Sequence, residues 1–222
     1  MFYRPVQYAG RHFSKTIQYS AIDFQKMSSI VPAFEARLRD WYITPCDLLC
    51  TGPDAWHNAF SVCALSCLLI DTLAQFEKNK SGRKSFIDFT KSHFPAFATP
   101  LSAPIRRPPP DDAPRDNIVN PAQALYFGFR CGILHEAHIP PYVQMLPEPN
   151  IVRTQATGIT TYATGDCMSV ILDPLRLFAA LNIEFQQYIA NLLDPDPAHD
   201  TLRVNFKAKF TNSFGIDITT AT

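Results

Sequence analysis

The sequence predicts a mainly α-helical bundle that carries a small β-hairpin in its C-terminal third. Apolar residues recur at three- and four-residue spacing in several long stretches, which is the periodicity of an amphipathic helix. Short runs typical of β-strands occur only beyond residue 150. Hydrophobic residues make up 46% of the 222 positions, with 17 Phe among them, so the chain can build the core of one large domain. We expect a single domain that covers residues 1–222.

The charge balance and the N-terminal segment restrict where the chain is expected to act. Lys and Arg together number 20, as do Asp and Glu, so no overall positive field attracts nucleic acid or an anionic membrane. The segment MFYRPVQYAGRHFSK lacks the continuous apolar stretch and the cleavage site of a secretory signal. The longest apolar run, Val62–Ile70, is too short to span a bilayer. We therefore expect a soluble, cytoplasmic protein without membrane contact.

Two helices are expected in the first third of the chain. The segment Asp23–Tyr42 has helical spacing, and Pro45 marks the connection that follows it. Trp56–Lys78 is apolar nearly all round, as expected of the central helix of a bundle. Asp71 is the one acid within the apolar run AFSVCALSCLLIDTLAQF, residues 59–76. It either faces solvent or serves a polar site, because an unpaired buried carboxylate is costly.

The middle of the chain combines a short helix with a proline-rich segment. Ser85–His93 predicts a short amphipathic helix. Basic residues gather around its start and form either a solvated face or an RNA-contacting patch. They are Lys78, Lys80, Arg83, Lys84 and Lys91. Residues 100–120, which include Pro108-Pro109-Pro110, predict an extended surface loop.

The next helix starts at Asn120-Pro121. Asn is a good N-cap residue and Pro fits the first helical position. We expect this helix to end before Pro140-Pro141, where residues 140–222 begin a C-terminal extension made of a hairpin and a helix.

The extension carries the predicted β-structure. Ile151–Ala156 and Met168–Leu172 predict two short strands of a hairpin, with Gly158 and Gly165 between them. Asp173-Pro174 then begins another amphipathic helix. The stretch 201–214 alternates like a strand but also fits a helix, and the spacing leaves both possibilities open.

Cysteines and isolated histidines offer weaker indications of a site. We expect the six cysteines to be reduced core residues, although Cys46/Cys50 and Cys63/Cys67 have a four-residue spacing that places two thiols on one helical face. A metal site is the alternative for these cysteines, as it is for His135, Glu136 and His138. The remaining histidines are expected at the surface or at helix caps; they are His12, His57, His93 and His199.

The stretch YFGFRCGILHEA carries the most informative motif, in which Arg130 and His135 are separated by four residues. It resembles the Arg-x4-His signature of the HEPN superfamily, whose all-α domains occur in toxin, phage-defence and RNA-processing systems. The apolar helix with the embedded Asp71 is similar to the partner helix of that fold. The resemblance implies a metal-independent endoribonuclease without a cofactor.

The chemistry explains why an arginine and a histidine would be paired. Cleavage of RNA without a metal needs a base for the ribose 2′-OH and an acid for the leaving 5′-oxygen, and imidazole suits both near neutral pH. A guanidinium offers fixed positive charge to the phosphate oxygens. In an ideal α-helix, however, Arg130 and His135 lie roughly 140° apart around the axis. The length of arginine, a distortion near Gly132 or a two-fold dimer would bring them together, and the family resemblance implies the dimer.

One position departs from the family pattern. HEPN nucleases commonly have a polar residue after the arginine, where this chain has Cys131, a weak hydrogen-bond donor. Two hypotheses follow. The chain is a homodimeric ribonuclease for single-stranded RNA, with His135, Arg130 and Asp71 as catalytic candidates. Alternatively, it is a non-catalytic HEPN-like dimeric scaffold, an antitoxin partner or a nucleotide-binding module.

The ribonuclease hypothesis also names residues that would contact the RNA, and both hypotheses allow a cognate antitoxin or another regulatory protein as a partner. The RNA-contacting candidates are Tyr126, Cys131, Lys80, Arg83 and Lys84.

Overall fold

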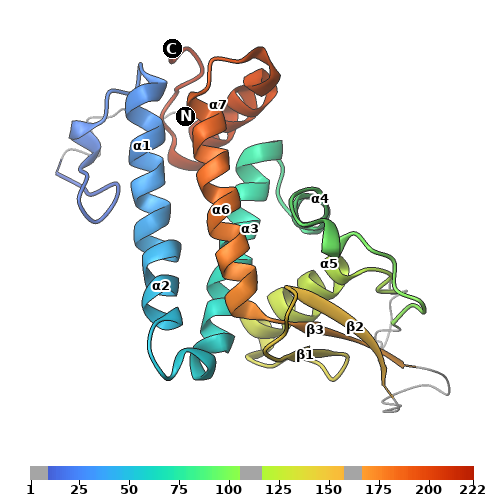
Figure 1. Cartoon of the computed structure of the whole chain (residues 1–222). Coiled ribbons are helices and arrows are strands. Elements are labelled where there is room, and N and C mark those ends of the chain that lie inside the picture. The colour runs from blue at the N-terminus through green and yellow to red at the C-terminus, as the bar shows by residue number, and fades with distance from the viewer. Residues whose placement is uncertain (1–9, 106–116, 158–166) are drawn as a thin grey trace.

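Helices make up most of the chain, and a small three-stranded sheet lies in its C-terminal part, so the predicted mainly α fold is confirmed. The computed structural model describes residues 10–105, 117–157 and 167–222. Long helices stand side by side in one half of the molecule, and the sheet with its covering helices forms the other half (Figure 1).

The first helical segment is longer than predicted. After the short 3-10 turn η2 (Tyr19–Ala21), α1 (Met27–Leu38) continues through a π-helical turn, η3 (Arg39–Ile43), into α2 (Thr44–Cys50). The prediction that Pro45 marks a connection is wrong. Pro45 lies in the first turn of α2, directly after the π-helical turn η3, and the helical path continues through it.

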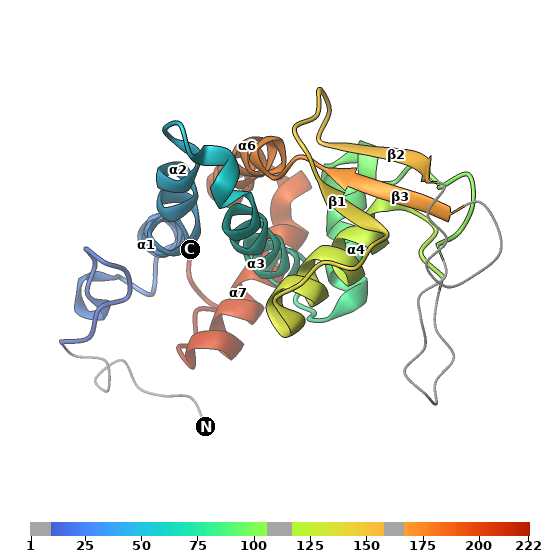
Figure 2. The same cartoon turned by 90° about the horizontal axis from the view of Figure 1, so that it is seen from below.

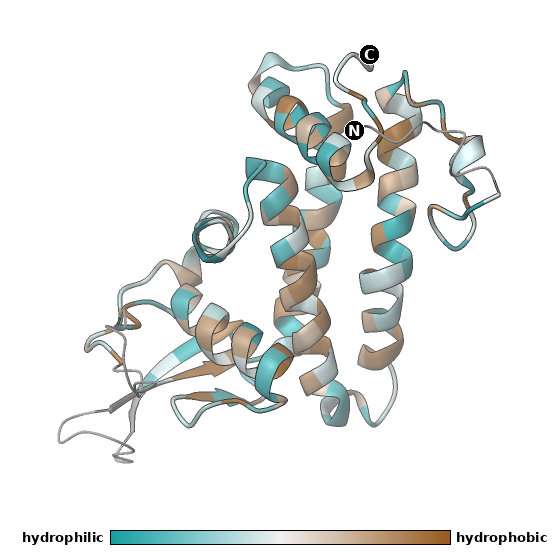
Figure 3. Cartoon of the chain, turned by 180° about the vertical axis from the view of Figure 1, so that it is seen from behind, coloured by the Kyte–Doolittle hydropathy of each residue, from teal (hydrophilic) through white to brown (hydrophobic). Residues whose placement is uncertain are grey.

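The predicted central helix is confirmed as α3 (Ala59–Lys78), which follows the 3-10 turn η4 (Ala55–Asn58). It packs against α6, α4, α7 and the helix that carries Arg130. Hydrophobic residues cover much of its length (Figure 3). The helix Ala55–Lys78 is long and apolar enough to cross a membrane by length and composition, whereas the apolar run alone is too short. A core helix passes the same test, and 56% of the apolar window is buried.

The predicted short helix is confirmed as α4 (Arg83–His93), followed by the 3-10 turn η5 (Pro95–Phe97). The ends of the predicted surface loop are anchored in the core, because Ile105 and Ile118 pair as an antiparallel bridge and are both buried. The middle of that loop, residues 106–116, lies outside the described residues.

The helix that starts at Pro121 has an unusual form. Asn120 caps it as predicted, since its side chain accepts a hydrogen bond from the backbone N–H of Gln123. The short α5 (Pro121–Ala124) then becomes a π-helix, η6 (Leu125–Glu136). It ends at Ala137, whose φ of 51° lies in the left-handed region.

The predicted hairpin is confirmed and gains a third strand. β2 (Val152–Thr157) pairs antiparallel with β3 (Cys167–Leu172), and β1 (Val143–Met145) adds to β3 in parallel, which gives the order β1-β3-β2. The predicted turn residues Gly158 and Gly165 lie outside the described residues. The sheet lies beside η6 and α4 when the molecule is seen from below (Figure 2).

Two further helices complete the bundle. α6 (Pro174–Leu193) runs along α3, and α7 (Asp200–Phe214) follows the 3-10 turn η7 (Pro197–His199). Residues 201–214, for which the sequence allowed either a strand or a helix, therefore form a helix. Its buried face joins an aromatic cluster that ties the chain ends to α1 and α3; the rings belong to Phe13, Phe34, Phe76, Phe206, Phe210 and Phe214.

Asp173 is the residue that joins α6 to the sheet. Its buried carboxylate accepts hydrogen bonds from the backbone N–H groups of Leu175 and Arg176, which caps α6, and from that of Glu148. Removal of this carboxylate would leave buried N–H groups without an acceptor, which is costly.

We therefore expect Asp173→Ala to lower the free energy of unfolding by about 2 kcal/mol, measured by urea denaturation followed by circular dichroism. Asp196→Ala is the matched control, because Asp196 caps only the exposed turn η7. It should change the free energy of unfolding by less than about 0.5 kcal/mol. Equal effects of the two variants would contradict this role of Asp173.

Candidate functional site

The structure brings Asp71, Arg130 and His135 together within one chain. Arg130 Nη2 donates a hydrogen bond to Asp71 Oδ2 at 2.9 Å, and Arg130 Nη1 lies 3.1 Å from His135 Nε2. Asp71 comes from α3, and the other two residues come from η6. Asp71 thus faces a polar site and not solvent, which is one of the two possibilities that its sequence context left open.

The π-helix explains how residues five positions apart meet. A π-helix forms hydrogen bonds between residues i and i+5, so such residues are neighbours on one face, whereas in an α-helix they diverge. Arg130 and His135 form one pair of this kind. Tyr126 and Cys131 form another, joined by a side-chain hydrogen bond. The convergence of Arg130 and His135 therefore requires no second protomer.

Two glycines allow η6 to approach its surroundings. A Cβ atom on Gly132 would lie 2.4 Å from the backbone oxygen of His138, where the chain folds back over the end of the helix. A Cβ atom on Gly128 would lie 2.6 Å from Cγ1 of Val143 in β1. Both distances are shorter than any normal contact, so glycine is required at each place.

The polar contacts continue beyond the three predicted residues. Gln75, one turn after Asp71 in α3, donates to Asp71 Oδ1 at 3.3 Å, and Lys209 of α7 donates to Gln75 Oε1 at 2.9 Å. A chain of hydrogen bonds thus connects α7 through α3 to η6. Sequence analysis missed Gln75 and Lys209, although the four-residue spacing of Asp71 and Gln75 on a predicted helix indicates a contact between them.

Arg130 is firmly held as a cation. Burial by itself lowers the pKa of Arg130, but the hydrogen bond and charge of Asp71 raise it above the usual value. The guanidinium carbon also lies 5.6 Å from the ring centre of Tyr126. Burial raises the pKa of Tyr126, and the neighbouring Cys131 adds to this effect, so the phenol stays neutral near pH 7.

The contact with Arg130 determines which ring nitrogen of His135 acts as a hydrogen-bond acceptor. A guanidinium only donates, so Nε2 of His135 must accept from Arg130 and carries a lone pair. A neutral ring in this arrangement has its proton on Nδ1. His135 is exposed, whereas only 21% of the Arg130 side chain is accessible. Each of Nη1 and Nη2 retains a second N–H for a ligand, and Nε is buried without a partner among the described residues.

Only part of the predicted RNA-contacting group lies next to η6. Tyr126 and Cys131 belong to η6 itself, and the guanidinium carbon of Arg83 lies 5.7 Å from the ring centre of Phe127. Phe86 of α4 packs edge-on against Tyr126 with a ring separation of 5.4 Å. The start of α4 therefore forms one side of the site.

Lys80 and Lys84 are not brought into this arrangement by any contact between described residues. Lys80 is exposed in the connection between α3 and α4. Lys84 is exposed as well and forms an ion pair with Asp88 one turn further along α4. This part of the basic cluster fits the solvated face that the sequence also allowed.

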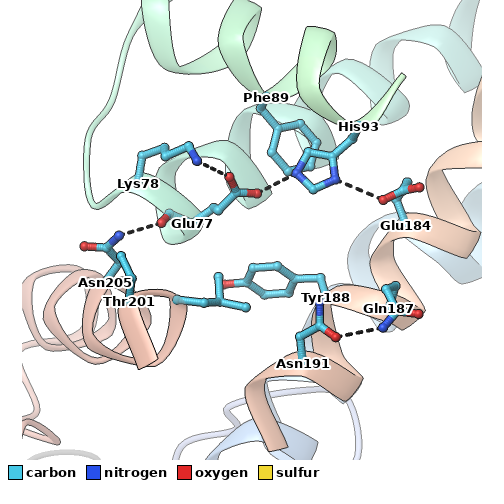
Figure 4. Close-up of a pocket in the computed structure, with 11 residues that line it drawn as sticks. Glu77, Lys78, Phe89, His93, Glu184, Gln187, Tyr188, Asn191, Thr201 and Asn205 are labelled. Atoms are coloured by element: carbon cyan, nitrogen blue, oxygen red, sulfur yellow. Dashed lines mark hydrogen bonds and ion pairs between the residues drawn. The ribbon is translucent and has the colours of Figure 1, made fainter. Parts of the chain in front are cut away.

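His93 is half-buried at the C-terminal end of α4, and it has partners that the sequence did not predict. Its two ring nitrogens contact Glu77 of α3 and Glu184 of α6, and the residue forms part of the wall of a cavity (Figure 4). No pattern in the sequence joins these three residues, because they come from three different helices. His12 and His57 are exposed, as predicted.

Three of the cysteines pack in the core, whereas Cys50 and Cys131 are half-buried. Cys46, Cys63 and Cys67 are buried, as predicted. Burial raises the pKa of Cys46 to about 12 and that of Cys63 well above the usual value, so both thiols are protonated at neutral pH. Within the described part of the chain, no group of three or more His, Cys, Asp or Glu residues is placed to hold a metal ion.

Comparisons with known proteins identify no relative. No protein-family model matches the chain, and neither curated proteins nor solved structures include a significant match. The geometry of Asp71, Arg130 and His135 is therefore the main indication of a function.

The end of η6 yields a paired prediction. Gly132→Ala should lower the free energy of unfolding by about 2 kcal/mol, because the new methyl group meets the fixed backbone oxygen of His138. Ala137→Gly should raise it by about 0.5 to 1 kcal/mol, since glycine adopts the left-handed conformation without strain. Thermal and urea denaturation would measure both. If Gly132→Ala leaves the free energy of unfolding unchanged, the backbone oxygen of His138 does not lie as close to Gly132 as described.

Proposed function

We propose that the chain is a metal-independent endoribonuclease of the HEPN type that cleaves single-stranded RNA in the cytoplasm. The observation that supports this most is the contact between Arg130 and His135, held in place by Asp71. A fixed cation and an exposed imidazole lie side by side there, as phosphodiester cleavage without a metal requires.

Each residue has a distinct task in this proposal. The free N–H groups of Arg130 bind the oxygens of the scissile phosphate, and charge that builds up on these oxygens strengthens the contact. Asp71 fixes the plane of the guanidinium, so it is a positioning residue. As Nη1 turns to the phosphate, the lone pair on Nε2 of His135 becomes available to the ribose 2′-OH.

The reaction balances without a cofactor. His135 Nε2 takes the proton of the 2′-OH, the 2′-oxygen bonds to phosphorus, and the bond from phosphorus to the 5′-oxygen breaks. The products are a 2′,3′-cyclic phosphate and a 5′-hydroxyl end. The 5′-oxygen receives its proton from an imidazolium, which in a homodimer is His135 of the second protomer. Tyr126 and Arg83 offer a ring and a charge to the neighbouring nucleotides.

The first test is cleavage of varied single-stranded RNAs in the presence of EDTA. We expect wild-type protein to yield cyclic phosphate ends, and His135→Ala and Arg130→Ala to lose about 100-fold or more of the rate. His138→Ala is the matched control, since His138 is exposed and lies close in sequence, and it should retain activity. Inert wild-type protein, or equal cleavage by His135→Ala, would exclude the proposed mechanism.

A non-catalytic role is the second candidate, and Cys131 favours it. A HEPN-like dimeric scaffold, antitoxin partner or nucleotide-binding module would not use Arg130 or His135 in a chemical reaction. In that case Arg130→Ala would keep its fold and its binding to a partner protein, and the wild type would not turn over RNA. RNA turnover together with failure to capture any partner counts against this alternative.

A further inference from the structure

His93, the last residue of α4, joins α4 to two other helices. Its Nε2 lies 2.7 Å from Glu77 Oε2 of α3, and its Nδ1 lies 2.9 Å from Glu184 Oε2 of α6. The ring of Phe89 stacks on it at a separation of 4.2 Å. Figure 4 shows the imidazole between the two carboxylates. We refer to these contacts as the His93 bridge.

The His93 bridge forms one wall of a cavity of about 300 Å³ between α3, α4, α6 and α7. Tyr188 of α6 lies across from the bridge (Figure 4). Its side chain is buried, and its hydroxyl has no hydrogen-bond partner among the described residues. The cavity gives water and protons a route to the bridge.

The two carboxylates determine the protonation of His93. An ionised carboxylate only accepts, so a ring that donates to both Glu77 and Glu184 must carry both protons. Burial lowers the pKa of His93, but the hydrogen bonds to Glu77 and Glu184 together raise it above the usual 6.5. Burial raises the pKa of Glu77, yet its contacts with His93 and Lys78 lower it overall, so Glu77 is ionised at neutral pH.

Tyr188 and Lys78 are the other ionisable groups that line the cavity. Burial raises the pKa of Tyr188 well above the usual value, which keeps its hydroxyl protonated. Lys78 pairs with the second oxygen of Glu77. From α7, the wall of the cavity receives only Thr201, Leu202 and Asn205, which carry no charge.

The bridge is asymmetric, so loss of one proton has a defined outcome. Only 12% of the Glu77 side chain is accessible, against 30% for Glu184. A lone pair that faces a carboxylate is repelled more strongly where water screens the contact less, so a neutral His93 keeps the proton on Nε2, toward the more buried Glu77. The lone pair of Nδ1 then faces Glu184, and this contact becomes repulsive.

We propose that the contact between His93 and Glu184 is a pH-sensitive latch on the cavity. The latch is closed while the imidazole carries both protons, and it releases Glu184 when the ring loses the proton on Nδ1. Release separates the last turn of α4 from α6 and opens the cavity beside Tyr188. The stabilisation that the bridge contributes is complete below pH 6.5 and is lost as the pH rises through the higher pKa of the folded state. This inference does not depend on ribonuclease activity.

Hydrogen exchange and NMR test the latch on the full chain. In wild-type protein, amide protection around residues 90–94 and 184–191, corrected for the intrinsic exchange rate, should fall roughly tenfold in a step above pH 6.5. Nitrogen-15 shifts of His93 should show loss of the Nδ1 proton first. In Glu184→Gln, amide protection should stay high across this pH range and show no step. The reason is that a glutamine amide can accept a hydrogen bond from Nδ1–H and can also donate one to the lone pair of Nδ1.

Two more variants complete the test. His93→Ala should show low protection at every pH, and His57→Gln, which alters an exposed histidine, should reproduce the wild-type curve. The proposal is overturned if Glu184→Gln keeps the wild-type step, if the Nε2 proton leaves first, or if His93→Ala matches the protection of wild-type protein at low pH. Because Glu184→Gln preserves a hydrogen bond to His93, it tests the latch even if His93→Ala does not fold.

Discussion

The ion pair between Asp71 and Arg130 connects the central helix to η6, and the geometry of the candidate site depends on it. Only 14% of the Asp71 side chain and 21% of that of Arg130 are accessible. A charge that is removed from water to this extent needs a partner of opposite charge. Asp71 and Arg130 therefore each offset the cost of burying the other. The remaining bonds of Asp71 and Arg130 lead to Gln75 and His135. One partly buried pair thus orients a side chain at the surface.

The π-helical form of η6 is the second constraint. Such helices are rare, and they occur frequently at functional sites. In this chain, the form places His135 above Arg130 and Cys131 above Tyr126. Gly128 and Gly132 permit the approach of β1 and of the chain that follows the helix. The surrounding structure therefore supports a conformation that the local sequence alone does not favour.

Much of the fold could be predicted because it depends on local patterns. Helical spacing located the central helix, Asn120-Pro121 and Asp173-Pro174 marked two helix starts, and alternating residues marked the hairpin. The prediction failed where long-range contacts decide the outcome. The parallel strand β1 pairs with a strand more than 20 residues later, and the helical path continues through Pro45 by way of the π-helical turn that precedes it.

The candidate site shows the same division. Arg130 and His135 were identified from a motif, and Asp71 from the cost of an acid in an apolar helix. Their convergence was not predictable from the α-helical period, since five residues place two side chains on one face only in a π-helix. The His93 bridge could not be predicted from the sequence for a different reason. Glu77, His93 and Glu184 come from three helices, so only tertiary packing brings them together.

Carboxylates of α3 neutralise a cation at two positions, and this limits how the site can act. Glu77 pairs with His93, and Asp71 pairs with Arg130, as befits a chain with equal numbers of acidic and basic residues. A phosphate that approaches Arg130 therefore meets a guanidinium whose charge is already partly compensated. Because Asp71 uses one N–H and His135 another, the phosphate can bind to the remaining N–H groups without breaking the ion pair. In the proposed mechanism, the contact that the phosphate displaces most easily is the one to His135, because that side chain is exposed, and this displacement would make the imidazole available as a base.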